Sequence, residues 1–382
     1  MSNLSVSSGA GVAAQRFNGE CGKPPTPTER VLERVQHGGY FVRAFRDKLD
    51  GINRTQWERD YMDYVGVVNA RNLSFSTMLT VGMPLFNVIK ELLLDRTTNR
   101  NIVWATANYT KFNPSFRENE PMFEDKDLQI IYNGVMCPRV QRCKDEQQRR
   151  TKAKAEVFTP SWICNKMNNL CDEYWFGVSG VFNTENADNT WTPTQAPISF
   201  TAKKTWQKYV DSRRLEITCG EAPYLVSRYD TTTGEYFEPA KRIGILDRKL
   251  RVINENTDTF EDWWKWVQRA YEATYGYEYQ GDNLLFARVN MVQTFIDYYI
   301  ERYNDVPADK YIKKIATIVS WNLWQMDGLK DTVPYVPATD NNNLMILELL
   351  GVEETQPREI FSKIKDWRSN KVVEFRSLKE GV

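Results

Sequence analysis

Histidine is almost absent from this chain of 382 residues, since His37 is the only one. A Ser-His-Asp triad or a histidine-based metal site would depend on this single side chain, which lies in a polar segment and which we expect at the surface. The six cysteines form no Cys-x-x-Cys pair, and one histidine cannot complete a Cys/His cluster, so we expect no bound metal. Histidine-based hydrolases and common zinc folds are therefore poor explanations of this sequence.

Long apolar runs and a net charge are missing as well. No run approaches the roughly 18 residues of a membrane span, and the N-terminus lacks a basic start followed by an apolar stretch. We therefore expect a reduced, cytoplasmic protein without a membrane partner. The 50 basic and 50 acidic residues cancel, whereas a free-standing DNA-binding protein is usually basic. This chain alone is expected to show only weak non-specific binding to DNA.

The composition changes along the chain and predicts three parts. Residues 1–30 are rich in Ser, Gly, Pro and Thr and are predicted to form a disordered leader. Residues 31–154 carry apolar residues at helical spacing and are predicted to form a mainly helical domain, with Arg100–Tyr109 as a strand. Residues 155–382 alternate strand-like and helix-like segments, which predicts an α/β domain with a mostly parallel sheet.

A basic stretch ends the N-terminal part. Its side chains Arg149, Arg150, Lys152 and Lys154 could contact the phosphates of a nucleic acid. The alternative is a solvated face of a helix, which the same pattern describes equally well. The sequence leaves both interpretations open, so these four residues are candidates for nucleic-acid binding and no more.

Two helices of the α/β part have clear signals. Four apolar residues after Pro160 recur on one face of an amphipathic helix, namely Ile163, Met167, Leu170 and Tyr174. Further along, Thr259 and Asp262 fit an N-terminal capping pair, and a stripe of apolar residues follows them. These signals predict one helix from about residue 161 and another from about residue 260.

The segment LEITCGEAPYL predicts a strand, a tight turn and the start of a helix. The strand would end between Glu216 and Thr218, Cys219 and Gly220 would make the turn, and Glu278 would end the next strand. Ligands of a doubly wound sheet bind beyond the carboxyl ends of its strands, where an acidic residue accepts hydrogen bonds from ribose hydroxyls. The sequence therefore predicts a nucleoside site here, unless Glu278 only caps a helix.

The loop is unusual for a nucleotide with phosphates. It has one glycine, and the gap from Gly220 to Glu278 is far longer than in the dinucleotide fingerprint. A ligand that has a ribose and an adenine but no phosphate fits better, and S-adenosylmethionine is such a ligand. Its charged amino-acid end would meet Glu216, Thr218 and the amides of the loop.

Three segments, in this order, resemble the adenine-N6 DNA methyltransferases of restriction-modification systems: Ala155–Pro160, the LEITCGEAPYL loop and Tyr275–Glu278. More closely, the chain is similar to proteins described as restriction endonuclease subunit M, over about residues 155–300. The resemblance implies a Rossmann-like class I S-adenosylmethionine-dependent methyltransferase fold and DNA as the partner. It also implies a role in a restriction-modification or phage-defence system.

The resemblance further implies roles for individual residues. Phe158, Thr159 and Pro160 stand where the family contacts the methionine end of the cofactor, and Glu278 stands where the family binds the ribose. Ala222 takes the place of the second glycine of the family's loop. An alanine is tolerable there if the backbone is not left-handed.

The catalytic motif of the family, [D/N]-P-P-[Y/F], is not found at the corresponding place. The nearest approximation is DTVPY, whose Asp331, Pro334 and Tyr335 would hold the target base, with a plain turn as the alternative. Only a short stretch follows Tyr335, so a target-recognition domain would have to come from the N-terminal part or from another chain. A specificity or catalytic partner subunit is therefore expected.

Three hypotheses follow. The first is an S-adenosylmethionine-dependent DNA adenine-N6 methyltransferase or its modification subunit. The second is a catalytically inactive relative that binds cofactor or nucleic acid or scaffolds a complex, which the missing motif favours. The third is a nuclease, which is weaker because Phe123–Asp127 is charged but gives no strand that carries a D…ExK metal site.

Overall fold

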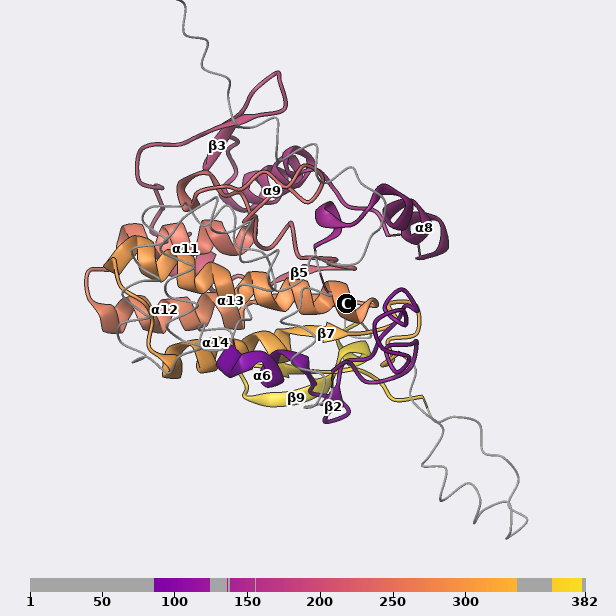
Figure 1. Ribbon diagram of the computed structural model, residues 1–382. Helices are drawn as coiled ribbons and strands as arrows, with labels where there is room; N and C mark the ends of the chain where they lie inside the picture. The colour runs from indigo at the N-terminus through magenta and orange to yellow at the C-terminus, as the bar shows by residue number, and fades with distance from the viewer. Residues whose placement is uncertain (1–85, 124–135, 137, 155, 335–358, 380–382) are drawn as a thin grey trace, which may run out of the picture.

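A parallel three-stranded sheet in the order β5-β6-β7 lies at the centre of the fold (Figure 1). The computed structural model describes residues 86–123, 136, 138–154, 156–334 and 359–379. The strands of the sheet are β5 (Arg214–Glu216), β6 (Thr274–Glu278) and β7 (Leu323–Gln325). Both strand pairs are parallel, so the predicted α/β alternation with a parallel sheet is confirmed.

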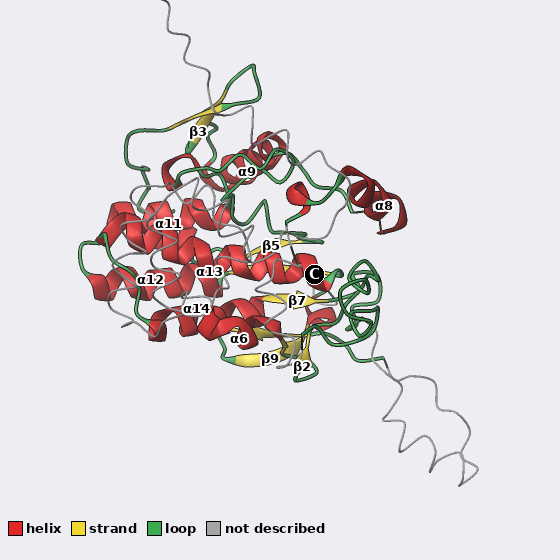
Figure 2. Ribbon diagram, in the orientation of Figure 1, coloured by secondary structure: helices red, strands yellow, loops and turns green. Residues whose placement is uncertain are grey.

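Pairs of helices join each strand of this sheet to the next, as Figure 2 shows. In chain order the helices are α11 (Ile245–Asn256) and α12 (Phe260–Glu272), then α13 (Gly281–Tyr303) and α14 (Asp309–Asn322). The predicted cap of α12 is confirmed, because the hydroxyl of Thr259 accepts a hydrogen bond from the amide of Asp262 at 3.2 Å. The local sequence therefore predicts the start of α12 correctly.

The two faces of the sheet carry different layers. One face packs against the four helices in a large apolar core, in which Trp263 is fully buried. The other face presents Tyr275 and Tyr277 to an antiparallel hairpin of β8 (Lys363–Asp366) and β9 (Lys371–Glu374). All residues of β6 and β7 are therefore buried between helices and the hairpin.

The other elements are short. They are η2 (Phe86–Val88), α6 (Ile89–Leu93), β1 (Leu94–Asp95), β2 (Arg100–Asn101), η4 (Arg139–Gln141), α8 (Lys144–Lys154), β3 (Asn183–Glu185), β4 (Trp191–Pro193), α10 (Trp206–Val210), η5 (Pro239–Lys241) and η6 (Phe375–Leu378). The strand predicted over Arg100–Tyr109 is wrong beyond its first two residues. After β2 the backbone makes one further bridge, at Val103, and is otherwise irregular.

The described part of the N-terminal region packs directly on the α/β core. The side chain of Gln325, at the end of β7, bonds both the amide and the carbonyl of Val103, at 2.8 and 2.9 Å. The guanidinium of Arg288 donates to the carbonyls of Leu92 and Leu323, at 2.6 and 2.7 Å. The segment after β2 is therefore held at the carboxyl end of the sheet. The predicted leader, residues 1–30, lies outside the described residues.

Helix α9 (Ser161–Phe176) exposes its apolar face and buries its polar face, which is the reverse of the usual arrangement. Its four predicted apolar positions do share one face, but Met167, Leu170 and Tyr174 are exposed, Tyr174 by 91%. The buried face is polar, because partners are available there: Asn168 donates to the carbonyls of Tyr224 and Ile243, at 3.0 and 2.9 Å. Satisfied hydrogen bonds thus replace apolar contacts on the inner face of this helix.

Candidate cofactor site at the carboxyl end of the sheet

The loop after β5 turns with three residues in the left-handed region. Thr218, Gly220 and Ala222 have φ values of 46°, 54° and 65°. The amide of Cys219 donates to the carbonyl of Tyr277 on β6, and the amide of Ala222 donates to Cys219, at 2.8 and 2.7 Å. Glycine adopts this conformation without strain, but threonine and alanine do not. The condition for tolerating Ala222 is therefore not met, and a strained residue stands where the family has its second glycine.

Glu278 connects this loop to the neighbouring strand. One carboxylate oxygen accepts from the amide of Gly220 at 2.8 Å, and the other accepts from the amide of Gln280 at 2.9 Å. The side chain is only 7% exposed, and its burial raises the pKa to about 7 although both amide bonds oppose that shift. A carboxylate has about four acceptor positions, so two remain for a ligand such as a ribose.

Glu216 and Cys219 are buried in the protein, whereas Thr218 is exposed. The carboxylate of Glu216 accepts from the amides of Tyr224 and Leu225, at 3.5 and 3.2 Å, and burial raises its pKa well above the usual value. The Thr218 hydroxyl donates to the adjacent carbonyl, and the buried Cys219 thiol has its pKa raised well above the usual value by burial. The amide contacts of Glu216 shape the loop, and the prediction that Glu216 and Thr218 meet a ligand stays a prediction.

The predicted FTP segment does reach the loop. The Cε1 atom of Phe158 is 3.7 Å from the position that a Cβ on Gly220 would occupy, so the ring packs against the turn. The guanidinium of Arg139 lies 4.9 Å from the centre of this ring, and the Arg139 amide donates to the carboxylate of Glu221 at 2.7 Å. Phe158, Gly220 and Glu278 therefore meet at one place, although 120 residues of sequence separate the first from the last.

Thr159 and Pro160 have backbone roles in the structure. The carbonyl of Thr159 accepts from the hydroxyl of Thr231 at 3.2 Å. Pro160 precedes the first turn of α9, and its carbonyl accepts from the amides of Ile163 and Cys164, at 3.0 and 3.2 Å. The two residues anchor the start of α9 beside the loop, which keeps Phe158 in place.

Three buried polar atoms around these elements have no hydrogen-bond partner. They are the Oε1 of Gln280, the Nε of Arg139 and the Nδ2 of Asn108. Gln280 follows Glu278 by two residues, and Asn108 precedes Tyr109, whose hydroxyl donates to Asp282 at the start of α13. An unpaired buried polar group costs about 1–3 kcal/mol. The unpaired atoms of Gln280 and Arg139, which lie next to Glu278 and Phe158, could bind a polar ligand.

No sequence motif pointed to these three residues. Gln280 could have been suspected from its place next to Glu278, since residues just after a strand end face the same ligand space. Arg139 lies far away in the sequence and reaches the site only through tertiary packing. Spacing along the chain carries no information about such contacts.

The structure contradicts the prediction that Arg150 contacts a nucleic acid. Its guanidinium is buried and pairs with Asp282 at 2.7 Å and with Glu156, while Arg142 pairs with Glu156 at 3.1 Å. Burial opposes ionisation of Asp282, but the two guanidinium groups outweigh it and lower the pKa of that carboxyl to about 2. Arg150 is therefore part of a buried ion cluster and cannot reach phosphates on a nucleic acid.

Two other residues of the basic stretch are accessible at the surface. Arg149 and Lys152, both on α8, are exposed, and the side chain of Lys154 lies outside the described residues. Arg149 and Lys152 therefore remain candidates for phosphate contacts. The alternating burial arises because Arg150 lies on the inner face of α8, one residue away from Arg149.

An ion pair and two backbone bridges hold the DTVPY segment. Asp331 has a φ of 60° and pairs with Lys379 at 2.6 Å, and Thr332 forms bridges with Asp327 and Phe361. Pro334 is buried, and Tyr335 lies outside the described residues. The segment follows β7, which β6 separates from β5, so about two strand spacings of roughly 4.8 Å lie between it and the loop.

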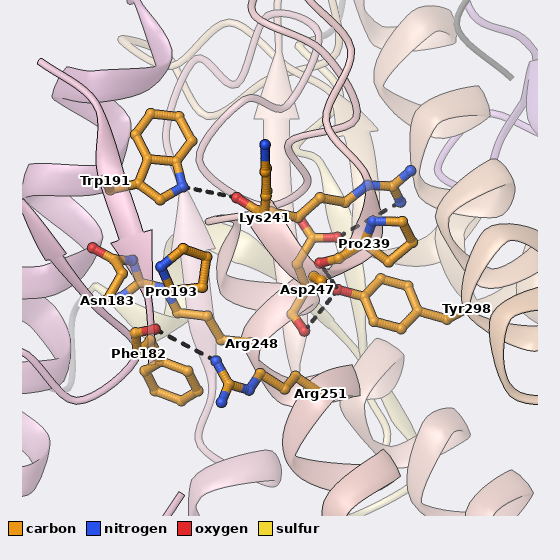
Figure 3. Close-up of a pocket in the computed structure, with 12 residues that line it drawn as sticks. Phe182, Asn183, Trp191, Pro193, Pro239, Lys241, Asp247, Arg248, Arg251 and Tyr298 are labelled. Atoms are coloured by element: carbon orange, nitrogen blue, oxygen red, sulfur yellow. Dashed lines mark hydrogen bonds and ion pairs between the residues drawn. The ribbon is translucent and has the colours of Figure 1, made fainter. Parts of the chain in front are cut away.

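A small hollow lies elsewhere in the molecule (Figure 3). Its polar lining includes Asn183, Trp191, Lys241, Arg242, Asp247 and Tyr298. The indole of Trp191 donates to the carbonyl of Lys241 at 2.8 Å, as Figure 3 shows. None of the residues that line this hollow belongs to the predicted site, so it is separate from the place where Phe158, Gly220 and Glu278 meet.

The parallel sheet and its helices place the described chain in the α/β class. No family model, no curated protein and no solved structure matches the sequence. In the part of the chain that the structure describes, every helix is too short or too polar to cross a membrane. The same part contains no group of three or more His, Cys, Asp or Glu side chains that could hold a metal ion.

Proposed function

We propose that the chain binds S-adenosylmethionine beyond β5 and β6 and serves as the modification subunit of a DNA adenine-N6 methyltransferase. The observation that carries the proposal is the contact of Glu278 with the amide of Gly220, with Phe158 packed on the same glycine. Three segments that resemble the cofactor motifs of the family thus meet at one place. A Rossmann-like methyltransferase fold is part of this proposal.

The residues of the site would share the work of binding. Glu278 accepts hydrogen bonds from the ribose hydroxyls, and Gln280 accepts from a further donor of the ligand. Arg139, whose Nε is unpaired, donates to the carboxylate at the methionine end, beside Phe158. When bound, the cofactor supplies an electrophilic methyl group. Because the amine of adenine can attack that group directly, positioning supplies most of the catalysis, and the scarcity of histidine is no obstacle.

A non-catalytic role is the second candidate. The observation that favours it is the ion pair between Asp331 and Lys379. Asp331 belongs to the segment that is most similar to the catalytic motif of the family, and this ion pair engages its carboxylate. A chain of this kind would bind the cofactor or a nucleic acid and leave methyl transfer to another subunit.

Transfer of a radiolabelled methyl group separates the two candidates. The purified chain is incubated with labelled S-adenosylmethionine and unmethylated bacterial DNA, and the DNA is digested to nucleosides. Label in N6-methyladenine supports an active enzyme. Cofactor binding without any labelled nucleoside supports the non-catalytic role, and the absence of cofactor binding contradicts the first candidate.

The affinity for S-adenosylmethionine should depend on pH. Burial raises the pKa of Glu278 to about 7, and only the ionised carboxylate accepts from two hydroxyls. We expect the affinity to fall about tenfold as the pH is lowered from about 8 to about 6. Glu278→Gln should bind more weakly and show no such change. Calorimetric titrations across this range test the expectation, and a constant affinity of the parent chain would contradict it.

Exposed basic residues of α8 should contribute to DNA retention. Replacing Arg149 and Lys152 with Gln should reduce the slope of log affinity against log salt concentration by about 2, because two phosphate contacts are lost. A control with Lys265 and Lys313 replaced by Gln removes two exposed lysines from other helices and should keep the slope. If the parent chain does not bind DNA at low salt, or if both double variants behave alike, α8 is only a solvated face.

A further inference from the structure

A buried amide side chain lies beside Glu278 at the carboxyl end of the sheet. Gln325, the last residue of β7, is buried and stands opposite Glu278, the last residue of β6, in the parallel register. Neighbouring strands are about 4.8 Å apart, and the amide of Met326 donates to the carbonyl of Glu278 at 3.1 Å. The side chains of Glu278 and Gln325 therefore start from adjacent points on one face of the sheet.

The amide group of Gln325 makes three hydrogen bonds to the backbone. Its oxygen accepts from the amide of Val103 at 2.8 Å, and its nitrogen donates to the carbonyls of Val103 and Tyr279, both at 2.9 Å. A side-chain amide has two donor hydrogens, and each of them has a carbonyl here. Val103 thus fixes the plane of the Gln325 amide, and Tyr279 receives its second donor.

The carbonyl of Tyr279 belongs to the peptide group that orients Glu278. The same planar group carries the N–H of Gln280, which donates to the carboxylate of Glu278 at 2.9 Å. In a trans peptide group the carbonyl and the N–H point in opposite directions. Gln325 and the carboxylate of Glu278 therefore hold one peptide group from its two sides.

Gln325 opposes a rotation of this peptide group. Such a rotation would turn the carbonyl of Tyr279, in place of the N–H of Gln280, toward the carboxylate of Glu278. Both oxygens are acceptors, so the carboxylate would lose a hydrogen bond and would no longer be fixed in its present orientation. The rotation would also break the bond from Gln325 to Tyr279 in the buried end of the sheet, which is unfavourable.

We propose that Gln325 is a positioning residue of the cofactor site, which orients the carboxylate of Glu278 toward the ribose hydroxyls through the Tyr279–Gln280 peptide group. The inference rests on the proposed function, because it takes Glu278 as the acceptor of the ribose. It also gives the N-terminal part a role in the site, since Val103 fixes the amide of Gln325.

The glycine at position 281 permits this arrangement. A Cβ on Gly281 would overlap the carbonyl oxygen of Val103, the same oxygen that accepts from Gln325. Any other residue type would carry a Cβ there and would push Val103 away. The close approach of Val103 to the start of α13 is therefore part of what holds Gln325 in place.

The affinities of two ligands test the proposal. S-adenosylhomocysteine has both ribose hydroxyls and its 2′,3′-dideoxy analogue has neither, so the ratio of their affinities measures the hydrogen bonds to Glu278. In the parent chain this ratio should be at least about 100, because two hydrogen bonds to a charged group are lost. Gln325→Met keeps the length of the side chain but removes its amide, and it should lower the ratio at least about tenfold.

Asn322 provides a matched control at the other end of β6. It is fully buried, and its amide also makes three hydrogen bonds: its nitrogen donates to the carbonyls of Tyr271 and Thr274, and its oxygen accepts from the indole of Trp367. Asn322→Leu should lower the thermal stability about as much as Gln325→Met does. The ratio of affinities should nevertheless stay within about threefold of the ratio in the parent chain, because Glu278 keeps its orientation.

The outcomes separate a failure of this inference from a failure of the proposed function. If Gln325→Met keeps the ratio of the parent chain, or if both variants lower it equally, Gln325 does not position Glu278. A parent chain that binds the two ligands equally, or binds neither, contradicts the ribose assignment and this inference with it. If Gln325→Met does not fold, Gln325→Asn takes its place. Its amide is one methylene group too short to reach Tyr279 and Val103 together, so the ratio should again fall, and an unchanged ratio would overturn the proposal.

Discussion

Arg150→Gln is expected to destabilise the protein by about 3–5 kcal/mol, because it leaves buried carboxylates without their partner. Arg150 pairs with Asp282 and Glu156, and the side chains of all three are at most 5% exposed. Glutamine is shorter and uncharged, so the carboxylate of Asp282 would keep Arg142, the Tyr109 hydroxyl and the amide of Asn283. With total stabilities of roughly 5–15 kcal/mol, such a loss brings the chain close to unfolding.

The neighbouring arginine provides the matched control. Arg149→Gln removes the same type of side chain from the same helix, but at an exposed position, and should change stability by no more than about 0.5 kcal/mol. Urea unfolding of both variants and the parent, followed by circular dichroism, measures the difference. Equal stabilities of the two variants would contradict the buried ion cluster and return Arg150 to the nucleic-acid candidates.

Glu278→Ala is expected to weaken S-adenosylmethionine binding at least about 100-fold. Hydrogen bonds to a charged group contribute about 1.5–3 kcal/mol each, and two ribose hydroxyls would lose their acceptor. The substitution also leaves the amide of Gly220 without its partner at 2.8 Å, so the loop itself becomes less well fixed. Both effects act in the same direction on cofactor affinity.

Calorimetry on three proteins isolates the role of Glu278. Glu261→Ala removes an exposed carboxylate from the first turn of α12 and should bind the cofactor as the parent does. Thermal unfolding of each protein checks that the fold is kept. An affinity of Glu278→Ala within about threefold of the parent, with the fold intact, would contradict the ribose assignment.

The α/β core was predictable because its signals are local. Alternating strand-like and helix-like segments, the Thr259 cap and the turn at Gly220 each depend on neighbouring residues, and each is found in the structure. The meeting of Gly220 with Glu278 follows from the pairing of adjacent parallel strands, which brings their carboxyl ends to one edge. Such inferences need only the order of the elements.

The failures come from tertiary contacts that no local pattern encodes. The stripe at Met167, Leu170 and Tyr174 identified a helix but not the direction of its apolar face, because polar partners for Asn168 lie on other elements. Likewise, Arg150 sits in a basic run and is nevertheless buried, since Glu156 and Asp282 reach it from elsewhere. Charge runs and periodicities describe an element, whereas its surroundings decide which face is buried.

The position of the bound cofactor is tested most directly by a crystal structure of the chain with S-adenosylhomocysteine, which keeps the ribose, adenine and amino-acid parts. We predict the ribose hydroxyls within hydrogen-bond distance of the Glu278 carboxylate, with the amino-acid end beside Phe158 and Arg139. Ligand density at another place, such as the hollow beside Trp191, or a ribose that does not contact Glu278, would contradict the proposed site.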